Sequence, residues 1–488
     1  MFSTLLRRLG LLPGLVLFLL GLGLAHPALA SHLLGGEMTY KYLDSNGPTG
    51  TPVRYQITLI VYNNCLADGT GLIRSSYPIA LYYQGTGAQI STVTINETVR
   101  APCSLPNVPV GCTITPGQLS YIKQTFVGTF NLPASTAGYY ATWNSNARNG
   151  GIANVVGSGS ANMSLYCTMA PASLANSSPV FVNDAVANIC ANDTTYILNN
   201  AVDADGDQLV YSFGTPYVSG YPTTWTVPPA QIQFNTGYNV TQIQFNTGYN
   251  VTNPLGIPTS FPGNYANVNA TTGISKYLTS AIINTLYVVA VDVSEYRTIN
   301  NRRVLIGTTR RDVQLITVTC PTTTPPVLPT TSIPRNYTIE AGSSLTIPLT
   351  ATQINGHPLR MTANSILLDS TGGFNATFNN HIGYVSAGNP AGTATAGTAG
   401  NSTGTTPSTV SANFVYNSAC REARTAPYDI VLLVEDRGCA GKTVADILHI
   451  TVTKPSGPTD ITGNFSICGL PSTQSYSAVP GVAPTAPT

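Results

Sequence analysis

Short runs of alternating apolar and polar residues recur along the chain, and they predict a protein built from β-strands. In the run at 54–64, Tyr55, Ile57 and Leu59 alternate with the residues between them, which is the period of a strand with one buried face. The segments "PIALYYQ" at 78–84 and "TFVGTFNLP" at 125–133 have the same character. We find no convincing amphipathic helix beyond residue 30, so the pattern predicts an all-β fold.

Two parts of the chain look like copies of each other. "AVDADGDQLVY" at 201–211 aligns with "ATQINGHPLRM" at 351–361, with Gly206 matching Gly356 and Leu209 matching Leu359. The later strands also correspond, because "YVVAVDV" at 287–293 resembles "YDIVLLV" at 428–434 and "DVQLITVT" at 312–319 resembles "DILHITVT" at 446–453. Short strands separated by Gly- and Pro-rich turns predict two related immunoglobulin-like β-sandwiches.

With 488 residues the chain is too long for a single hydrophobic core. We divide it into a signal peptide at 1–30, an N-terminal β-sandwich-like domain at 31–175, and two sandwiches of the repeated type at 176–322 and 323–455. Residues 456–488 are interpreted as a linker and the start of a truncated further module. The Pro- and Thr-rich segment at 322–334 is predicted to be a stiff, extended linker.

The N-terminus has the three parts of a secretory signal peptide. Arg7 and Arg8 precede an apolar run at 11–24, and Ala28-Leu29-Ala30 forms a cleavage site of small residues. No later stretch is apolar enough to span a membrane. We therefore expect a secreted protein, extracellular or on the outer cell surface.

The chain carries few charges, and they nearly cancel. Only 8% of its residues are charged, against about 25% in an ordinary soluble protein. Removing Arg7 and Arg8 from the 21 basic residues leaves 19 against 20 acidic ones. This balance indicates neither a nucleic acid nor an anionic membrane as partner.

Secretion makes the nine cysteines candidates for disulfides. We predict that Cys190 pairs with Cys320, joining the two ends of the unit at 176–322, and that Cys420 pairs with Cys439. The four cysteines of the first unit allow three connectivities, of which Cys103 with Cys112 is favoured. Cys468 has no obvious partner.

Asp203, Asp205 and Asp207 stand at alternate positions in a chain with few charges. Carboxylates at this spacing converge when the loop curls around Gly206, and hard oxygen ligands suit calcium. Any such site needs further ligands, for which Asp184, Asp292 and Glu295 are candidates. The alternative is a turn held by aspartate side chains bonded to their own backbone. The matching positions of the next unit are Gln353, Asn355 and His357, so the fold itself does not require carboxylates there.

The chain has no recognisable catalytic motif. His32, His357, His381 and His449 are far apart in the sequence, and His449 is expected to be structural. Trp143, Trp225 and the 26 tyrosines are candidates for a sugar-stacking surface. We expect a protein that is not an enzyme.

Several longer motifs resemble those of a known group of proteins. "SHLLGGEMTYKYL" at 31–43, "NARNGGIANV" at 146–155, "AVDADGDQLVYSFGTP" at 201–216 and "CREARTAPYDIVLLVEDRGC" at 420–439 are similar to segments of large secreted surface proteins of gliding bacteria. The resemblance implies tandem PKD-like and cadherin-like β-sandwich modules, and its cadherin-like part supports a calcium site. The sorting domain that often ends such gliding-motility-associated proteins is lacking here.

Together these features predict an adhesin-like or scaffold protein of the cell surface. It would display its modules to a surface polysaccharide or a protein ligand, and it could associate with itself. Two alternatives stay open: an accessory binding region of a longer secreted enzyme, and a structural subunit that polymerises.

Overall fold

A computed structural model of the chain describes fifteen segments. They are residues 33–65, 73–104, 120–145, 148–181, 183–217, 244–280, 282–300, 302–320, 324–368, 373–381, 392–397, 407–438, 442–455, 460–462 and 477–479. The predicted signal peptide, His32, Cys112, Trp225, Cys439 and Cys468 lie outside the described residues.

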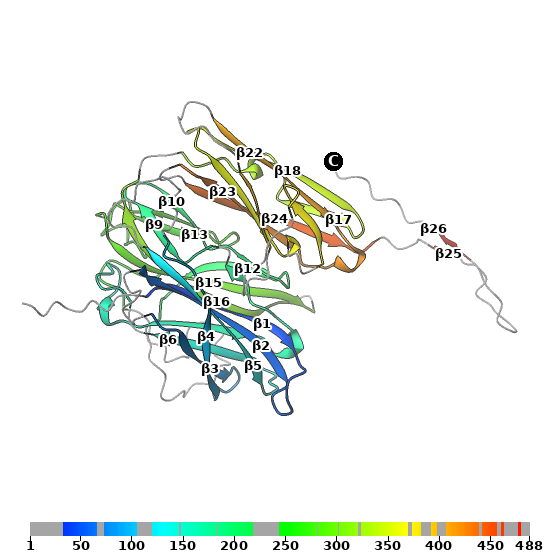
Figure 1. The fold of residues 1–488 in the computed structure, drawn as a ribbon, viewed down its shortest axis with the longest axis horizontal. Coiled ribbons are helices and arrows are strands. Elements are labelled where there is room, and N and C mark those ends of the chain that lie inside the picture. Colours follow the sequence, from blue (N-terminus) through cyan, green and yellow to red (C-terminus); the bar gives the residue numbers. More distant parts are fainter. Residues whose placement is uncertain are drawn as a thin grey trace, which may run out of the picture.

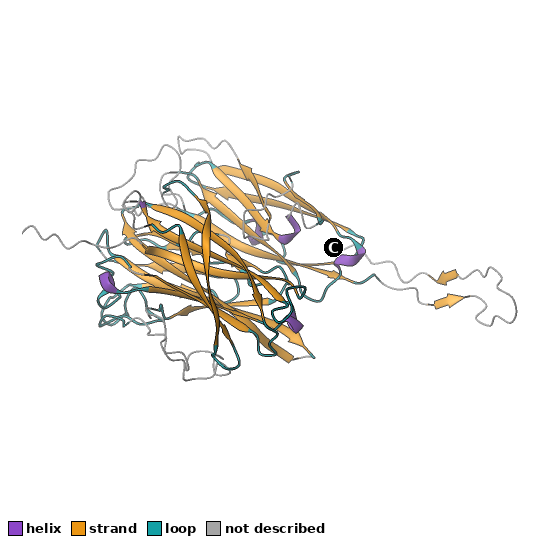
Figure 2. Ribbon diagram, turned by 60° about the horizontal axis from the view of Figure 1, so that its bottom comes forward, coloured by secondary structure: helices purple, strands orange, loops and turns teal. Residues whose placement is uncertain are grey.

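The fold is all-β, as the alternating pattern predicts (Figures 1 and 2). In the described segments the only helices are single 3-10 turns: η2 (Ser158–Ser160), η3 (Ala172–Leu174), η5 (Pro329–Thr331), η6 (Ile366–Leu368) and η7 (Cys420–Glu422). None of the helices in these segments is long and apolar enough to cross a membrane.

The N-terminal strands form a closed ring rather than the separate sandwich expected from the sequence. These strands are β1 (Leu33–Asp44), β2 (Val53–Asn64), β3 (Ser76–Tyr83), β4 (Gln89–Arg100), β5 (Tyr121–Leu132), β6 (Tyr139–Ser145) and β7 (Met163–Met169). They pair in the order β1-β2-β5-β4-β3-β6-β7, and β16 (Arg302–Val318) bonds to both β7 and β1 and completes the ring. The buried residues of the alternating strands, among them Tyr55, Phe126 and Trp143, fill its interior.

Strand β16 also belongs to the second unit, so the boundary predicted at residue 175 does not separate two sheets. One edge of β16 pairs with β15 (Leu286–Ile299) along its length. The other edge is divided: Thr309 pairs with β7, 311–313 pair with β1, and 314–318 pair with β9 (Val186–Cys190). Strand β16 is therefore shared by the ring and the second unit.

The second unit packs this shared sheet against smaller ones. Its remaining strands are β8 (Val180–Phe181), β10 (Thr195–Leu198), β11 (Ala201–Val202), β12 (Gln208–Gly214), β13 (Tyr265–Val268) and β14 (Ile274–Leu278). Strands β10, β14 and β13 form a three-stranded sheet, and β12 ends the large sheet next to β15. A hydrophobic cluster that includes Tyr211, Tyr277 and Val291 forms the core of the unit.

The third unit is a β-sandwich of its own. Its strands are β17 (Asn336–Glu340), β18 (Ser344–Gln353), β19 (Leu359–Ser365), β20 (Asn375–Phe378), β21 (Gly392–Gly397), β22 (Ser408–Asn417), β23 (Tyr428–Asp436) and β24 (Thr443–Thr453). A sheet ordered β17-β24-β23-β19-β21 faces a sheet ordered β18-β22-β20. A separate pair, β25 (Asp460–Thr462) and β26 (Ser477–Val479), follows the sandwich in the sequence and lies away from it (Figure 1).

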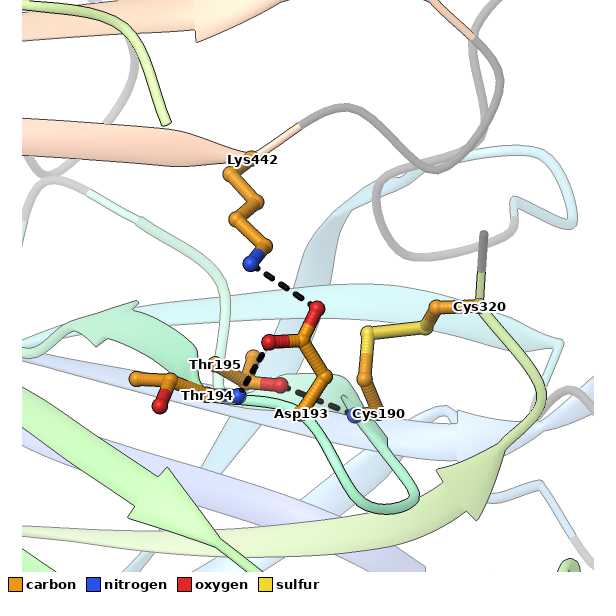
Figure 3. Close-up of a disulfide and its surroundings, with 6 residues drawn as sticks. All are labelled: Cys190, Asp193, Thr194, Thr195, Cys320 and Lys442. Carbon is orange, nitrogen blue, oxygen red and sulfur yellow. Dashed lines mark hydrogen bonds and ion pairs between the residues drawn. A yellow bond between two sulfur atoms is a disulfide. The ribbon is translucent and has the colours of Figure 1, made fainter. Parts of the chain in front are cut away.

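The second and third units are in direct contact. Leu198 and Val202 of the second unit belong to the hydrophobic cluster of the third. Lys442, immediately before β24, places its Nζ 2.8 Å from Oδ2 of Asp193 (Figure 3). The segment predicted as a stiff, extended linker packs on the third unit, because Val327 pairs with Thr352 and the buried Thr330 hydroxyl donates to Asp446.

Two disulfides are formed between described cysteines. Cys190, the last residue of β9, bonds to Cys320, just beyond β16, which is the pair predicted from the sequence (Figure 3). Cys65 bonds to Cys103, so the favoured pairing of Cys103 with Cys112 is wrong. Cys420 is a free, exposed cysteine, which differs from the predicted bond to Cys439.

Candidate metal centre

The aspartate run forms a tight turn between β11 and β12. Asp203 Oδ1 accepts hydrogen bonds from the backbone N–H groups of Asp205 and Asp207, each at 2.9 Å. Gly206 has φ of +77°, a conformation that glycine adopts without steric cost. The turn predicted as the alternative to a metal site is therefore present.

The same turn brings two of its carboxylates next to a third one from β15. Strands β12 and β15 pair in antiparallel register, with Leu209 opposite Glu295. One carboxylate oxygen each from Asp203, Asp207 and Glu295 lies within 4.8 Å of the others. We call these three residues the acidic cluster. All three are buried, with exposed fractions of 5%, 6% and 0%.

Two oxygens of the acidic cluster accept no hydrogen bond from the described residues. They are Asp203 Oδ2 and Glu295 Oε1, and both are inaccessible to solvent. Buried polar atoms in folded proteins almost always have a partner, and an unpaired buried carboxylate oxygen is costly. These two atoms therefore indicate room for a cation or a proton.

Neighbouring side chains satisfy the other oxygens and link the acidic cluster to β1. Arg297 binds both oxygens of Asp207 at 2.7 Å. Asn176 Nδ2 donates to Glu295 Oε2 at 2.6 Å and to the Tyr40 hydroxyl at 2.8 Å. Arg297 is bonded to the acidic cluster and Arg424 interacts with Asp203 at longer range, so two guanidinium groups face three carboxylates and leave excess negative charge when all three are ionised.

Burial raises the pKa of Asp203 and of Glu295 well above their usual values, and the neighbouring carboxylates raise each pKa further. Ionisation of either group is therefore less favourable in the folded protein than in the unfolded chain, and a bound cation would offset this cost. The ligand atoms are carboxylate oxygens, which suit hard cations such as Ca²⁺ and Mg²⁺ better than thiophilic metals.

The structure brings together two of the three predicted ligands, Asp203 and Asp207. Asp205 stands outside the acidic cluster, because its Oδ2 accepts the Ser177 backbone N–H at 2.7 Å. Of the further candidates, Glu295 joins the site. Asp184 instead binds Lys123 and two tyrosine hydroxyls, and Asp292 binds Arg310.

The third unit contains the equivalent site with a different set of side chains. Gly356 has φ of +72°, and Asp436 lies opposite Leu359 as Glu295 lies opposite Leu209. There Gln353 Nε2 donates to Asp436 Oδ2 at 2.9 Å, and His357 Nδ1 lies 2.9 Å from both oxygens of Asp436.

The third unit thus has one carboxylate at this position, Asp436, and neighbouring side chains of the protein bind it. The second unit has three carboxylates at the equivalent position. This internal comparison separates the role of the turn from that of the charges. The turn is common to both units, and the excess negative charge belongs to the second unit alone.

The pH dependence of stability should report on this excess charge. A carboxyl whose pKa is raised on folding stabilises the protein fully below its unfolded pKa and loses this contribution as pH rises toward the folded pKa. In chelator, the free energy of unfolding of the wild type should therefore fall as pH rises above about 4.5, relative to the Asp203→Asn, Glu295→Gln variant. Urea unfolding across this range measures the difference, and parallel curves for the two proteins would contradict it.

Two further candidates from the sequence, Trp143 and His449, occupy structural positions. Trp143 is buried in the N-terminal ring with an exposed fraction of 1%, so it offers no sugar-stacking surface. His449 Nδ1 lies 2.7 Å from Asp429 Oδ1, on the strand pair β23–β24. Arg297 and Asn176 were not identified as site residues, because their part in the site depends on contacts across 90 and 119 residues.

Comparisons with known proteins do not identify the chain. No protein-family model matches it, and no curated protein matches it in sequence. The titin Ig tandem domains A164–A165 are 10% identical over 57% of this chain and 97% of that chain, with a TM-score of 0.16. The titin I-band fragment I67–I69 is 7% identical over 86% of this chain and 99% of that chain, with a TM-score of 0.14.

A third solved structure, the sialic acid binding region of a Streptococcus sanguinis SK1 adhesin, is 10% identical over 58% of this chain and 80% of that chain, with a TM-score of 0.16. Scores this low support no inference about function. The architecture given above rests on the strand pairing alone.

Proposed function

We propose that the protein is an exported, non-enzymatic scaffold of the cell surface that presents a rigid array of β-units for adhesion, with calcium at the acidic cluster. The observation that carries this proposal is the position of the acidic cluster where the three units meet. Tyr40 of β1 reaches it through Asn176. From the third unit, Arg424 Nη1 lies 3.3 Å from the Ala204 carbonyl oxygen of the same turn.

A cation at this position would hold the units in one arrangement. A Cβ at position 206 would lie 2.9 Å from the Ala426 Cβ of the third unit. The aspartate turn therefore packs directly against the third unit. Calcium accepts six to eight oxygen ligands in flexible geometry, so carboxylates supplemented by water would satisfy it.

The surroundings of the histidines support a role without catalysis. His357 and His449 each bind a carboxylate. Within the described part of the chain, neither ring accepts a hydrogen bond from a serine or threonine hydroxyl or a cysteine thiol, as a nucleophilic mechanism requires. Both pairs are better explained as contacts that satisfy buried or half-buried charges.

Calcium is expected to raise the melting temperature of the full-length protein. A ligand present at 100 times its Kd adds about 2.7 kcal/mol to the free energy of unfolding. The Asp203→Asn, Glu295→Gln variant should lose the rise, whereas Asp205→Asn should keep it because Asp205 lies outside the acidic cluster. Differential scanning calorimetry in calcium and in chelator measures this. An equal melting temperature in both solutions for the wild type would contradict the proposal.

The adhesive part of the proposal has its own test. Beads coated with the full-length protein are expected to attach to bacterial cells or to films of cell-surface polysaccharide, and to attach less in chelator. Beads coated with the same protein after heat denaturation provide the control. Attachment no greater than that of the control would count against adhesion and leave the calcium result unaffected.

A further inference from the structure

A cleft of about 660 Å³ lies beside the acidic cluster, between the second and third units. One wall consists of β12 and β15, with Gln208, Leu209 and Tyr296. The opposite wall comes from the third unit, with Thr425 and His449. Cavities of roughly 300–1,000 Å³ at contacts between domains are typical of small-molecule sites.

The charged groups that line the cleft are already paired. Arg297 binds Asp207 through two hydrogen bonds, and the His449 ring binds Asp429. A charged ligand would have to displace one partner of a pair and leave the other without compensation, which is unfavourable in a partly buried site. The cleft therefore favours a ligand without net charge.

The polar groups at the mouth of the cleft are of the kind that bind hydroxyls. Thr271, Thr298, Thr425 and Gln208 are exposed residues of its lining. Hydroxyl and amide groups each donate and accept hydrogen bonds, as sugar hydroxyls do. These residues come from both units, so a ligand in contact with all of them would bridge the junction.

Apolar surface lies next to these polar groups. Tyr296 lines the cleft, and the Arg303 guanidinium carbon lies 3.6 Å from the centroid of its ring. This cation–π contact favours one orientation of the ring. Leu209, Pro427 and Ile447 provide further apolar contacts, which suit the C–H faces of a pyranose ring.

We propose that this cleft binds a neutral saccharide of one or two sugar units. The inference deepens the proposed function, because it names the ligand class and the residues through which a surface would be recognised. It needs only the contact between the second and third units and does not depend on calcium.

The test is binding of full-length protein to an array of neutral glycans, with sialylated and sulfated glycans as a separate arm. Thr425→Trp and Ala270→Trp would fill the cleft from opposite walls. Thr346→Trp places the same side chain on an exposed position of β18, away from the cleft, and serves as the matched control.

We expect the wild type and Thr346→Trp to bind a neutral glycan, and both cleft variants to bind it at least tenfold more weakly. Binding of no neutral glycan, binding of the charged arm alone, or undiminished binding by both cleft variants would each overturn the inference. Saccharide binding is measured on purified protein, so its failure is distinguishable from a failure of adhesion in the bead experiment.

Discussion

Replacing both Cys190 and Cys320 by serine is expected to lower the free energy of unfolding by about 4–5 kcal/mol. The bond closes a loop with a sequence separation of 130 residues, and in the chain-entropy model the loss arises mainly because the unfolded chain gains freedom. The native ends should stay together, since Cys190 pairs with Val318 in the parallel β9–β16 ladder. Unfolding in guanidinium chloride measures the change.

The other described disulfide provides the comparison. Cys65 and Cys103 are separated by 38 residues, so replacing both by serine should cost slightly less, about 4 kcal/mol on the same model. A loss below about 1 kcal/mol for the Cys190 and Cys320 pair would show that the model does not apply here.

Replacing Arg311 by methionine is expected to lower the free energy of unfolding by about 3–5 kcal/mol at neutral pH. Arg311 and Glu37 are both buried and lie 2.5 Å apart, on β16 and β1, where the ring closes. Methionine fills similar volume but leaves the Glu37 carboxylate buried without its cation. Urea unfolding of the full-length protein measures the loss.

Two control variants distinguish the effect of the unpaired charge on the free energy of unfolding from the effect of altered packing. The Glu37→Gln, Arg311→Met double variant should recover part of the loss, because no unpaired charge remains. Arg54→Met removes an exposed ion pair with Asp44 and should cost less than about 1 kcal/mol. A loss for Arg311→Met as small as that for Arg54→Met would contradict the importance of the buried pair.

The features predicted correctly from the sequence are those with a local signal. Alternation at 54–64 predicts β2, and the match between 201–211 and 351–361 predicts two turns that share a glycine with positive φ. The two positions of Cys190 and Cys320 at the ends of one unit predict their disulfide. In each case the informative residues are close in sequence or recur in a copy.

The features that were missed depend on distant partners. Strand β16 contains Arg310 and Arg311 in the middle of a continuously buried run, and only the strand pairing of the folded chain shows which carboxylates compensate them. Alternation along a strand is the same in a sandwich and in a closed ring, so the pattern could not distinguish the two. Glu295 joins the acidic cluster through the β12–β15 register, whereas Asp205 leaves it through a backbone contact with Ser177.

The N-terminal ring can close only after strand β16 has been synthesised. The residues of the ring up to Met169 are synthesised long before the closing strand β16 at 302–318. Glu37 precedes its partner Arg311 by 274 residues. Until then β1 and β7 are unpaired edges next to a large apolar interior, and such edges invite pairing with other chains. The chain is therefore most prone to association with other chains in the interval between the emergence of Met169 and that of residues 302–318 in the compartment where it folds.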